Sequence, residues 1–165
     1  MPESMYRDIM KRLADRKLKI AVDATKSLLL NVLPFHPFVI KPNNHELGEL
    51  FNVKIKSKNQ AVEYAKKLQE MGAQNVIVSM AGEGAVFVGD DGSVFQSEAP
   101  KGTVVNSVGA GDSMVAGFLA GYLGVGDYKE AFKLGVCTGS ASAFSEQLAT
   151  REQVEAIRNT HHFEF

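Results

Sequence analysis

Three short apolar runs, each with polar residues at or near its end, constrain the fold of this chain more than any other feature. They are KIAVDA (19–24), FVIKPN (38–43) and NVIVSM (75–80). Nearly continuous apolar runs of this length are typical of parallel strands that are covered on both faces. Helical segments separate the runs, and strands that alternate with helices predict an α/β layered fold with a largely parallel sheet flanked by helices.

A helix and a β-hairpin lie on either side of the third run. Ser57 and Gln60 have the spacing of a capping box, which predicts that a helix begins there. The inward face of this helix is expected to carry Ala61, Ala65 and Leu68. Beyond the third run, the segments 84–89 and 93–98 flank Asp90-Asp91-Gly92, which is a strong signal for a hairpin.

The composition limits the classes of protein to which the chain can belong. Its 165 residues suffice for one compact domain, which we expect to span residues 1–165. A formal net charge of −1 with scattered basic residues argues against a nucleic-acid partner. No apolar run approaches the roughly 18 residues that a membrane span needs. The single cysteine, Cys137, is expected to be a packed hydrophobe in a reducing cytoplasm.

A glycine-rich loop, NSVGAGDS (106–113), opens the helical last part of the chain. Gly109, Ala110 and Gly111 have little or no side chain, so the backbone can turn tightly and approach a ligand closely. The helix that follows points unpaired N–H groups at the same place, which makes an anion site suited to a phosphoryl group. Asp112 lies in this pocket, where a carboxylate can accept the proton of an attacking hydroxyl.

Two other interpretations of this loop stay open from the residues alone. An aspartate in the first turn of a helix is favourable by about 0.3–1 kcal/mol through the helix dipole, without any catalytic duty. A dinucleotide fingerprint is a weak fit, because the glycines are at positions 109, 111 and 117 and no strand with an acidic residue follows. The Walker pattern with its lysine does not occur here either.

Four motifs occur in order along almost the whole chain. They are VDATKSLLL (22–30), KPNNHELGEL (41–50), VSMAGEGAVFV (78–88) and VVNSVGAGDSMVAGFLAG (104–121). Together they resemble the PfkB/ribokinase family of carbohydrate kinases, and within it the 1-phosphofructokinases and tagatose-6-phosphate kinases. The resemblance implies a ribokinase-like layered fold and ATP-dependent phosphorylation of a sugar phosphate, with fructose 1-phosphate converted to fructose 1,6-bisphosphate. Tagatose 6-phosphate is the alternative substrate.

The resemblance also assigns roles around the glycine-rich loop. It implies that Asp112 is the catalytic base, and that the N–H groups of Gly109, Ala110 and Gly111 form the anion hole for the transferred phosphoryl group. Most family members have Asp where this chain has Asn106, but the phosphofructokinase-like branch commonly has Asn. The departure therefore favours the assignment to that branch.

The motif that begins at Lys41 supplies the expected metal site. Asn43 and Glu46 form N-x-x-E, which in the family organises Mg²⁺ and phosphate, here expected to act through water. The same spacing is that of a helix N-cap with a capping box, and one residue can serve in both ways. Lys41 is expected to contact the phosphates of ATP, and a solvated lysine is the alternative. Asp23 is expected either to line the same crevice or to cap the turn at Thr25–Lys26.

Further nucleotide contacts are expected in two places. One is a turn that resembles the family's S/T-x-G-x-x-G motif, with Ala81 where Gly is usual. Its expected contacts are Ser79, Ala81, Gly82, Glu83 and Gly84. An ordinary loop into the hairpin is the alternative interpretation of this turn. The other is Ser142, in a run of small residues that leaves room for the adenine ring, although close helix packing explains Ser142 nearly as well.

The resemblance covers only part of the usual length of the family. Family members carry a glycine-rich sugar-binding segment and a small β-lid in their N-terminal half. Neither resembles anything in this sequence, so both are expected to be absent. We therefore expect self-association, for instance as a homodimer, through an exposed flank. The expected ligands are ATP, Mg²⁺ and a small sugar phosphate, with no nucleic acid and no membrane, and an inactive nucleotide-binding fragment is the alternative to a kinase.

Overall fold

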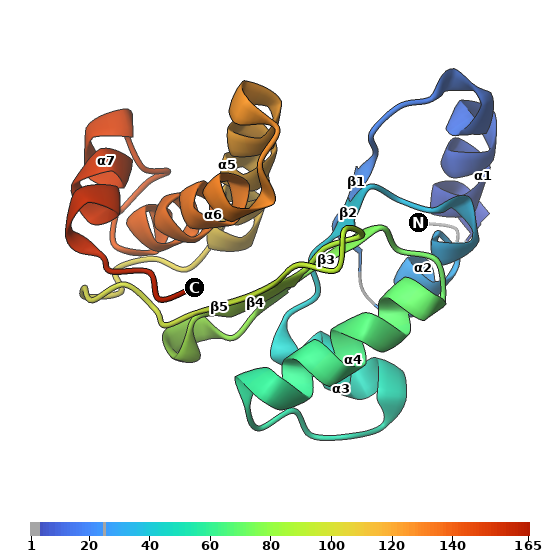
Figure 1. Cartoon of the computed structure of the whole chain (residues 1–165), viewed down its shortest axis with the longest axis horizontal. Helices are drawn as coiled ribbons and strands as arrows, with labels where there is room; N and C mark the ends of the chain where they lie inside the picture. Colours follow the sequence, from blue (N-terminus) through green and yellow to red (C-terminus); the bar gives the residue numbers. More distant parts are fainter. Residues whose placement is uncertain (1–3, 25) are drawn as a thin grey trace. The chain divides into compact units, whose positions relative to one another are not determined.

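The computed structural model describes residues 4–24 and 26–165 (Figure 1). Packing contacts divide the chain into two compact units. The first unit comprises Met1–Ser79 and Val86–Val94, and the second comprises Met80–Ala85 and Phe95–Phe165. That residues 1–165 form a single domain stays a prediction. In the described residues, no helix has the length and apolar character that crossing a bilayer requires.

Five strands form one sheet in the order β1-β2-β3-β4-β5. Their bounds are Ala21–Val22 (β1), Val39–Ile40 (β2), Asn75–Ser79 (β3), Ala85–Val88 (β4) and Val94–Ser97 (β5). β1 is parallel to β2, and β2 is parallel to β3, which confirms the prediction from the three apolar runs. β4 and β5 form the predicted hairpin, and the Gly89 N–H closes its turn by donating to the Ser93 carbonyl oxygen at 2.9 Å.

The first two strands are shorter than the apolar runs that predict them. The ladder pairs Ala21 with Val39 and Val22 with Ile40, and only these residues of the two runs belong to it. A ladder forms only where two strands lie side by side. An apolar run is therefore longer than its strand wherever the neighbouring strand has already turned away into a loop.

Helices cover the strands of the first unit. They are α1 (Ser4–Leu13), α2 (Lys26–Leu30), α3 (Asn44–Phe51) and α4 (Lys58–Glu70), with the 3₁₀ turns η1 (Ala14–Arg16) and η2 (Leu33–Phe35). α4 packs on β3, and its predicted inward residues Ala61, Ala65 and Leu68 are fully buried. Ser57 caps α4, but Gln60 accepts from the Lys56 N–H at 2.8 Å, so only half of the predicted capping box forms.

The core of the first unit lies around β2 and β3. Ile40, Val76 and Ile77 are fully buried, and each such side chain contributes about 1.5–3 kcal/mol relative to an exposed one. Asn75 is buried among them with both polar ends paired. Its Nδ2 donates to the Phe38 carbonyl oxygen at 2.8 Å, and its Oδ1 accepts from the Asp90 N–H at 3.1 Å. A satisfied polar group therefore ties β3 to the start of β2 and to the hairpin.

The second unit is mainly helical. It contains η3 (Ala81–Glu83), α5 (Ala110–Val125), α6 (Tyr128–Ala143) and α7 (Arg151–Thr160). α5 and α6 approach closely because glycines lie in their interface. A Cβ at Gly135 would lie 3.0 Å from the Met114 carbonyl oxygen, and one at Gly117 would lie 2.8 Å from the Leu134 carbonyl oxygen. Residues with side chains would push the two helices apart.

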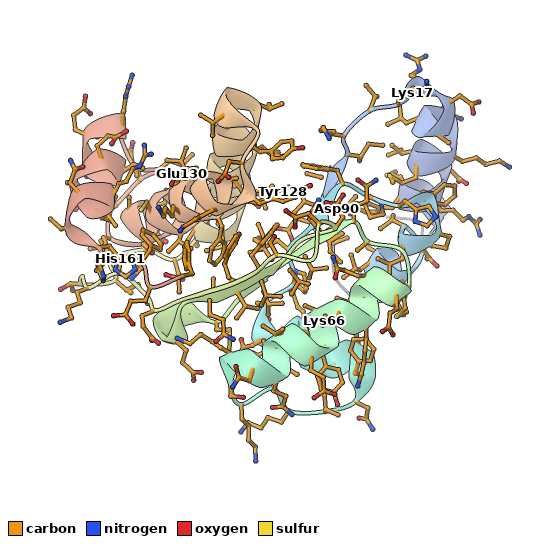
Figure 2. All side chains as sticks on the ribbon, in the orientation of Figure 1. Lys17, Lys66, Asp90, Tyr128, Glu130 and His161 are labelled. Atoms are coloured by element: carbon orange, nitrogen blue, oxygen red, sulfur yellow. The ribbon has the colours of Figure 1, made fainter. Side chains whose placement is uncertain are left out.

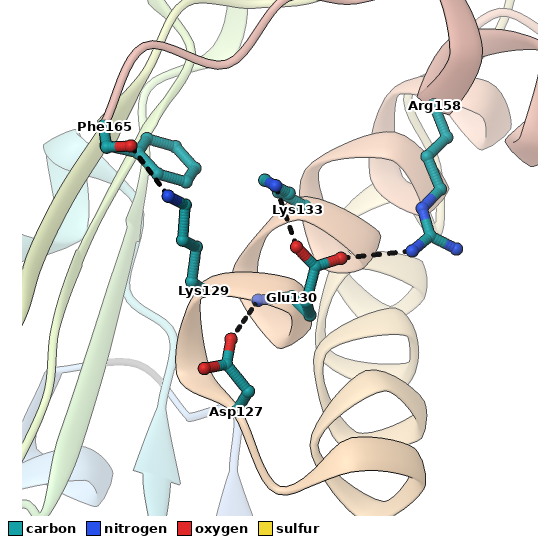
Figure 3. Close-up of polar contacts among 6 residues, drawn as sticks. All are labelled: Asp127, Lys129, Glu130, Lys133, Arg158 and Phe165. Carbon is teal, nitrogen blue, oxygen red and sulfur yellow. Dashed lines mark hydrogen bonds and ion pairs between the residues drawn. The ribbon is translucent and has the colours of Figure 1, made fainter.

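Charged residues join α6 to α7. Glu130 lies in the first turn of α6, which begins where Asp127 accepts from the Glu130 N–H at 2.8 Å. The two carboxylate oxygens of Glu130 contact Lys133 Nζ at 2.8 Å and an Arg158 guanidinium nitrogen at 3.1 Å (Figure 3). Glu130 therefore bridges a cation on its own helix and a cation on the next.

The segment after α7 packs on aromatic residues of the second unit. The ring of Phe165 lies 5.0 Å from that of Phe95, and Lys129 Nζ donates to the Phe165 carbonyl oxygen at 2.9 Å. His161, labelled in Figure 2, has its Nε2 3.3 Å from Ser97 Oγ. Burial lowers the pKa of His161, because the imidazolium form loses solvation there. The imidazole is therefore neutral at neutral pH.

Candidate functional site

Charged and polar side chains lie at the carboxyl ends of the parallel strands, as the sequence predicts. Lys41, which directly follows β2, is 6% exposed, and its Nζ lies 3.2 Å from the carboxylate of Asp23, which directly follows β1. A buried ammonium needs such a partner, because losing its water without compensation is costly. Lys41 is therefore not the solvated lysine of the alternative interpretation. The alternative for Asp23 was to cap the turn at Thr25–Lys26, and Thr25 lies outside the described residues.

Asn43 and Glu46 form the capping box of α3. Asn43 Oδ1 accepts from the N–H groups of His45 and Glu46 at 2.9 Å each, and Glu46 Oε2 accepts from the Asn43 N–H at 2.8 Å. The capping interpretation is confirmed. Two polar atoms, Glu46 Oε1 and Asn43 Nδ2, have no hydrogen-bond partner in the part of the chain that the structure describes.

Ser79 lies beside Asn43 in the first unit. The two residues pair as an isolated parallel bridge, and the Ser79 N–H donates to the Pro42 carbonyl oxygen at 3.2 Å. β2 and β3 therefore end side by side, and their ends bring Asn43, Glu46 and Ser79 into one neighbourhood. Ligands of open α/β sheets bind at this edge, beyond the carboxyl ends of the strands.

This neighbourhood is compatible with a hydrated divalent cation. Mg²⁺ takes oxygen ligands and keeps several of its own waters. Asn43 Oδ1 already accepts two hydrogen bonds, so Glu46 Oε1 is the oxygen of this pair that stays open to a hydrated ion. Among the described residues, no group of three or more His, Cys, Asp or Glu side chains is placed to hold an ion directly.

Apart from Ser79, the turn that we expected to contact nucleotide lies in the second unit. Ala81 has a φ of 48°, in the left-handed region that glycine adopts at less cost, which is why glycine suits this position. Ala81, Gly82 and Glu83 are exposed. Gly84 is buried, and its N–H donates to the Ala81 carbonyl oxygen at 3.0 Å. The turn therefore offers residues 81–83 to a ligand, whereas Gly84 serves the turn itself.

The glycine-rich loop leads into α5 as the sequence predicts, with one difference. Gly109 is the N-cap residue, has a φ of 78° and offers no side-chain cap. The Ala110 N–H donates to the Ser107 carbonyl oxygen at 3.2 Å, so it is not among the free amides. The N–H groups of Gly109, Gly111 and Asp112 find no acceptor within the described residues. The start of α5 is therefore a potential anion site in which the Asp112 amide takes the place of the Ala110 amide.

Asp112 is exposed on the first turn of α5. Within the described residues its carboxylate has neither an ion-pair partner nor a hydrogen-bond donor, in contrast to Asp23 and Glu46. The carboxylate is thus open to an incoming hydroxyl. The dipole of α5 stabilises it in the same place, so the electrostatic and catalytic interpretations remain compatible.

Asn106 holds the loop to the segment that follows α6. Its Nδ2 donates to the Glu146 carbonyl oxygen at 3.2 Å, and its Oδ1 accepts from the Val108 N–H at 3.0 Å. An aspartate has no N–H group for the first of these bonds. The side-chain amide of Asn106 therefore makes a bond that the Asp of most family members could not make at this position.

Ser142, an expected adenine contact, is buried where α6 packs on α5. It is 3% exposed on α6, its Oγ donates to Ser113 Oγ at 2.9 Å, and it accepts from the Ala149 N–H at 3.2 Å. This geometry agrees with the alternative of close helix packing. Ser113 was not singled out from the sequence, where its only signal is a serine directly after Asp112 in the first turn of a helix.

The class of protein is that of the ribokinase-like α/β folds. Two features point to it: polar residues at the carboxyl ends of the parallel strands, and a glycine-rich helix start without a side-chain cap. The family model described as pfkB family carbohydrate kinase matches residues 1–154. The chain belongs to this family.

Three similar proteins illustrate the match. The 1-phosphofructokinase of Bacillus subtilis is 47% identical over 157 residues, which are 95% of this chain and 52% of the relative. The D-tagatose-1-phosphate kinase of Bacillus licheniformis is 34% identical over 149 residues, 90% of this chain and 49% of the relative. A Staphylococcus aureus crystal structure described provisionally as a phosphofructokinase has a TM-score of 0.92 at 40% identity, covering 99% of this chain and 53% of its own. The chain thus spans about half the length of these relatives.

Proposed function

We propose that this chain is the nucleotide-binding and catalytic part of an ATP-dependent sugar-phosphate kinase. The favoured reaction transfers the γ-phosphoryl group of ATP to fructose 1-phosphate and forms fructose 1,6-bisphosphate. The observation that carries the proposal is the start of α5, where, among the residues that the structure describes, the carboxylate of Asp112 has no partner and the neighbouring N–H groups have no acceptor. Membership of the pfkB family supports phosphorylation of a carbohydrate, and the similarity to a 1-phosphofructokinase favours fructose 1-phosphate.

The start of α5 suits both needs of phosphoryl transfer. The charge on the moving group must be held, and the attacking hydroxyl must lose its proton. The free N–H groups of Gly109 and Gly111, aided by the positive end of the α5 dipole, face a negatively charged oxygen without reorganisation. Asp112 accepts the proton of the hydroxyl, so that the oxygen attacks as the γ-phosphoryl bond to ADP breaks.

Most of the other groups in the proposal belong to the first unit. Lys41 is a compact cation for the phosphates of ATP, and Asp23 balances its charge and limits its movement. Bound Mg²⁺ would neutralise phosphate charge, with Glu46 Oε1 accepting a hydrogen bond from one of its waters. Ser79 and the exposed residues 81–83 are the proposed contacts to the nucleotide.

Candidate substrates differ in which hydroxyl is attacked. Fructose 1-phosphate and D-tagatose 1-phosphate both offer the hydroxyl on carbon 6, and a relative named for each reaction matches this chain. Tagatose 6-phosphate, the alternative from the sequence motifs, offers the hydroxyl on carbon 1 instead. Assays with all three compounds decide among them.

We extend the proposal to location and assembly. A cytoplasmic location is supported by the single, buried and unpaired cysteine. Self-association, or docking to a further part of the protein, is supported by exposed aliphatic residues of the second unit. Among them are Val104, Val108 and Leu123, which are 63%, 80% and 76% exposed.

Replacing Asp112 by Asn tests the catalytic base. Because this chain spans about half of the B. subtilis relative, the test protein carries the first half of that relative in front of this chain. We expect Asp112→Asn to lower kcat by about 100-fold or more, since general bases contribute at least that much. The KM for ATP should stay within about threefold. Coupled detection of ADP measures both.

Asp127→Asn is the matched control, because it removes one carboxylate from the same unit while asparagine caps a helix as well as aspartate. Near-normal turnover of Asp112→Asn would reject the role of base. The second candidate function is that of a nucleotide-binding domain without turnover. It is supported if the unsubstituted protein binds ATP in a calorimetric titration but releases no ADP with any of the three substrates.

A further inference from the structure

The start of α5 lies directly against α6. A Cβ at Gly139 would lie 3.1 Å from the Ala110 carbonyl oxygen and 3.1 Å from Met114 Cβ. Glycine at this position lets the backbone of α6 touch the first turn of α5. One side chain of that turn facing the contact is polar, namely Ser113, which is 8% exposed.

A buried pair of hydroxyls crosses this contact. Ser142 Oγ donates to Ser113 Oγ at 2.9 Å, and the Ala149 N–H donates to Ser142 Oγ at 3.2 Å. Ser142 is 3% exposed, so its hydroxyl group cannot hydrogen-bond to solvent and depends on these two partners. Leaving such a buried group unpaired costs about 1–3 kcal/mol. Ser142 is therefore bonded at once to α5 and to the segment that follows α6.

That segment also contacts the glycine-rich loop. The Glu146 carbonyl oxygen accepts from Asn106 Nδ2 at 3.2 Å, and Leu148 Cδ2 lies 3.1 Å from the place of a Cβ on Gly109. The loop is thus held on the side of residues 106–109 by the segment 145–149. The first turn of α5 is held on the other side by Ser142.

The first turn of α5 needs such a restraint. Helix ends fray unless a side chain caps them, and Gly109 has no side chain to do so. Gly111 adds backbone freedom within the same turn. The bond between Ser113 and Ser142 is the polar restraint on the residue that directly follows Asp112.

We propose that Ser142 is a positioning residue for the start of α5. Through Ser113 it fixes the first turn, and through Ala149 it fixes the segment that supports the loop, so that Gly111 and Asp112 keep one orientation. This inference deepens the proposed function and rests on it, since the orientation matters for catalysis only if a phosphoryl group meets these amides. Ser142 then acts through Ser113 and does not contact the nucleotide.

Amide hydrogen exchange tests the restraint without any activity. In Ser142→Ala, we expect the amide of Ser113, which donates to the Gly109 carbonyl oxygen at 2.9 Å, to exchange about tenfold faster than in the unsubstituted chain, as expected for the loss of about one hydrogen bond. Ser113→Ala, which keeps the bond from Ala149 to Ser142, is the second variant if Ser142→Ala does not fold. Ser140→Ala is the control, because Ser140 lies on the same helix two residues earlier and therefore on another face.

Kinetics on the fused protein described above test the consequence. We expect Ser142→Ala to lower kcat by about tenfold, because small misplacements of reacting groups cost up to about 100-fold. The KM for ATP should change by less than about twofold, and Ser140→Ala should leave both values unchanged. The double variant Ser113→Ala, Ser142→Ala should be no slower than Ser142→Ala alone, since the bond that Ser113→Ala removes is already lost in Ser142→Ala.

The outcomes separate this inference from the proposed function. Unchanged exchange of the residue 113 amide in both variants overturns the positioning role, whatever the activity. A raised KM for ATP with an unchanged kcat overturns it as well, and assigns Ser142 to the nucleotide. Faster exchange in a protein whose unsubstituted form has no turnover supports the restraint while the proposed kinase function fails.

Discussion

Gly84 lies where the backbone passes from η3 into β4, within reach of the end of β5. Its φ is 93° and its ψ is −135°, a combination that residues with a Cβ rarely adopt. A Cβ at this position would overlap the Ser97 carbonyl oxygen and would lie 2.7 Å from the Glu98 carbonyl carbon. These are backbone atoms of a paired strand, so they cannot move aside as a flexible side chain can.

We therefore expect Gly84→Ala to lower the free energy of unfolding by about 2–4 kcal/mol, from backbone strain and overpacking together. Urea unfolding followed by circular dichroism measures the change. Gly82→Ala is the control, because a Cβ there meets nothing within 4 Å, and it should change the stability by less than about 1 kcal/mol. Equal losses in the two variants would show that the close approach to β5 is unimportant.

Residue roles could be predicted where the partners are close in sequence. The spacing of Asn43 and Glu46 predicts a capping box, and the structure contains it. The partners of Ser142 were out of reach, because Ser113 is 29 residues away and only the packing of α5 on α6 brings the two hydroxyls together. The Ala110 amide was predicted to be free because a sequence does not show the turn to Ser107.

The link between α6 and α7 depends on the charge of Glu130. Hydrogen bonding from Lys133, more than the contact with Arg158, lowers the pKa of Glu130. A carboxyl group whose pKa is depressed by folding stabilises the folded state above its unfolded pKa, and this contribution is lost as the pH falls through the folded pKa. The loss should thus begin below about pH 5 and be complete only below the depressed value.

We expect Glu130→Gln to destabilise the chain at pH 7 by less than about 1 kcal/mol, since partly exposed ion pairs are screened by water and salt. The difference from the unsubstituted chain should shrink as the pH falls below about 4.5, because the unsubstituted carboxyl group is then protonated too. Glu155→Gln is the control, because its contact with Arg158 is long, at 3.9 Å. A difference that grows at low pH would contradict this account.

Elements were predictable to different degrees, for physical reasons. The apolar runs predicted β1, β2 and β3 because a strand buried on both faces must be apolar throughout. Their short ladders were not predictable, since a ladder depends on where the partner strand turns away. Ser57 likewise caps α4 as expected. The Gln60 side chain, however, accepts a hydrogen bond from the Lys56 N–H instead of the Ser57 N–H, because spacing alone does not decide which of two neighbouring N–H groups lies within reach.

Cys137 reports on unfolding of the second unit as a whole. It is fully buried on α6, in a cluster with Ala141 and Val154. Burial raises the pKa of its thiol to about 11, because the thiolate loses its solvation there. The thiol is therefore protonated at pH 8, and no reagent reaches it unless the unit opens.

We expect a thiol reagent such as Ellman's reagent at pH 8 to label Cys137 at least about 100-fold more slowly in the folded chain than in urea. The difference in thiolate fraction alone accounts for that factor, and burial adds to it. Absorbance of the released thiolate follows the reaction, and N-acetylcysteine provides the unhindered control. Rapid labelling without denaturant would mean that α6 is open in solution.

At the scale of the whole molecule, nearby residues were enough to predict the order of strands and helices, the hairpin and the glycine-rich start of α5. Each of these depends on periodicity, caps and turns within a few positions of the chain. Only the tertiary structure shows three contacts. Lys41 is buried against Asp23, Gly84 lies close to β5, and Ser142 is hydrogen-bonded to Ser113. Those contacts join residues that are far apart in the chain, and only the folded core brings them within reach of one another.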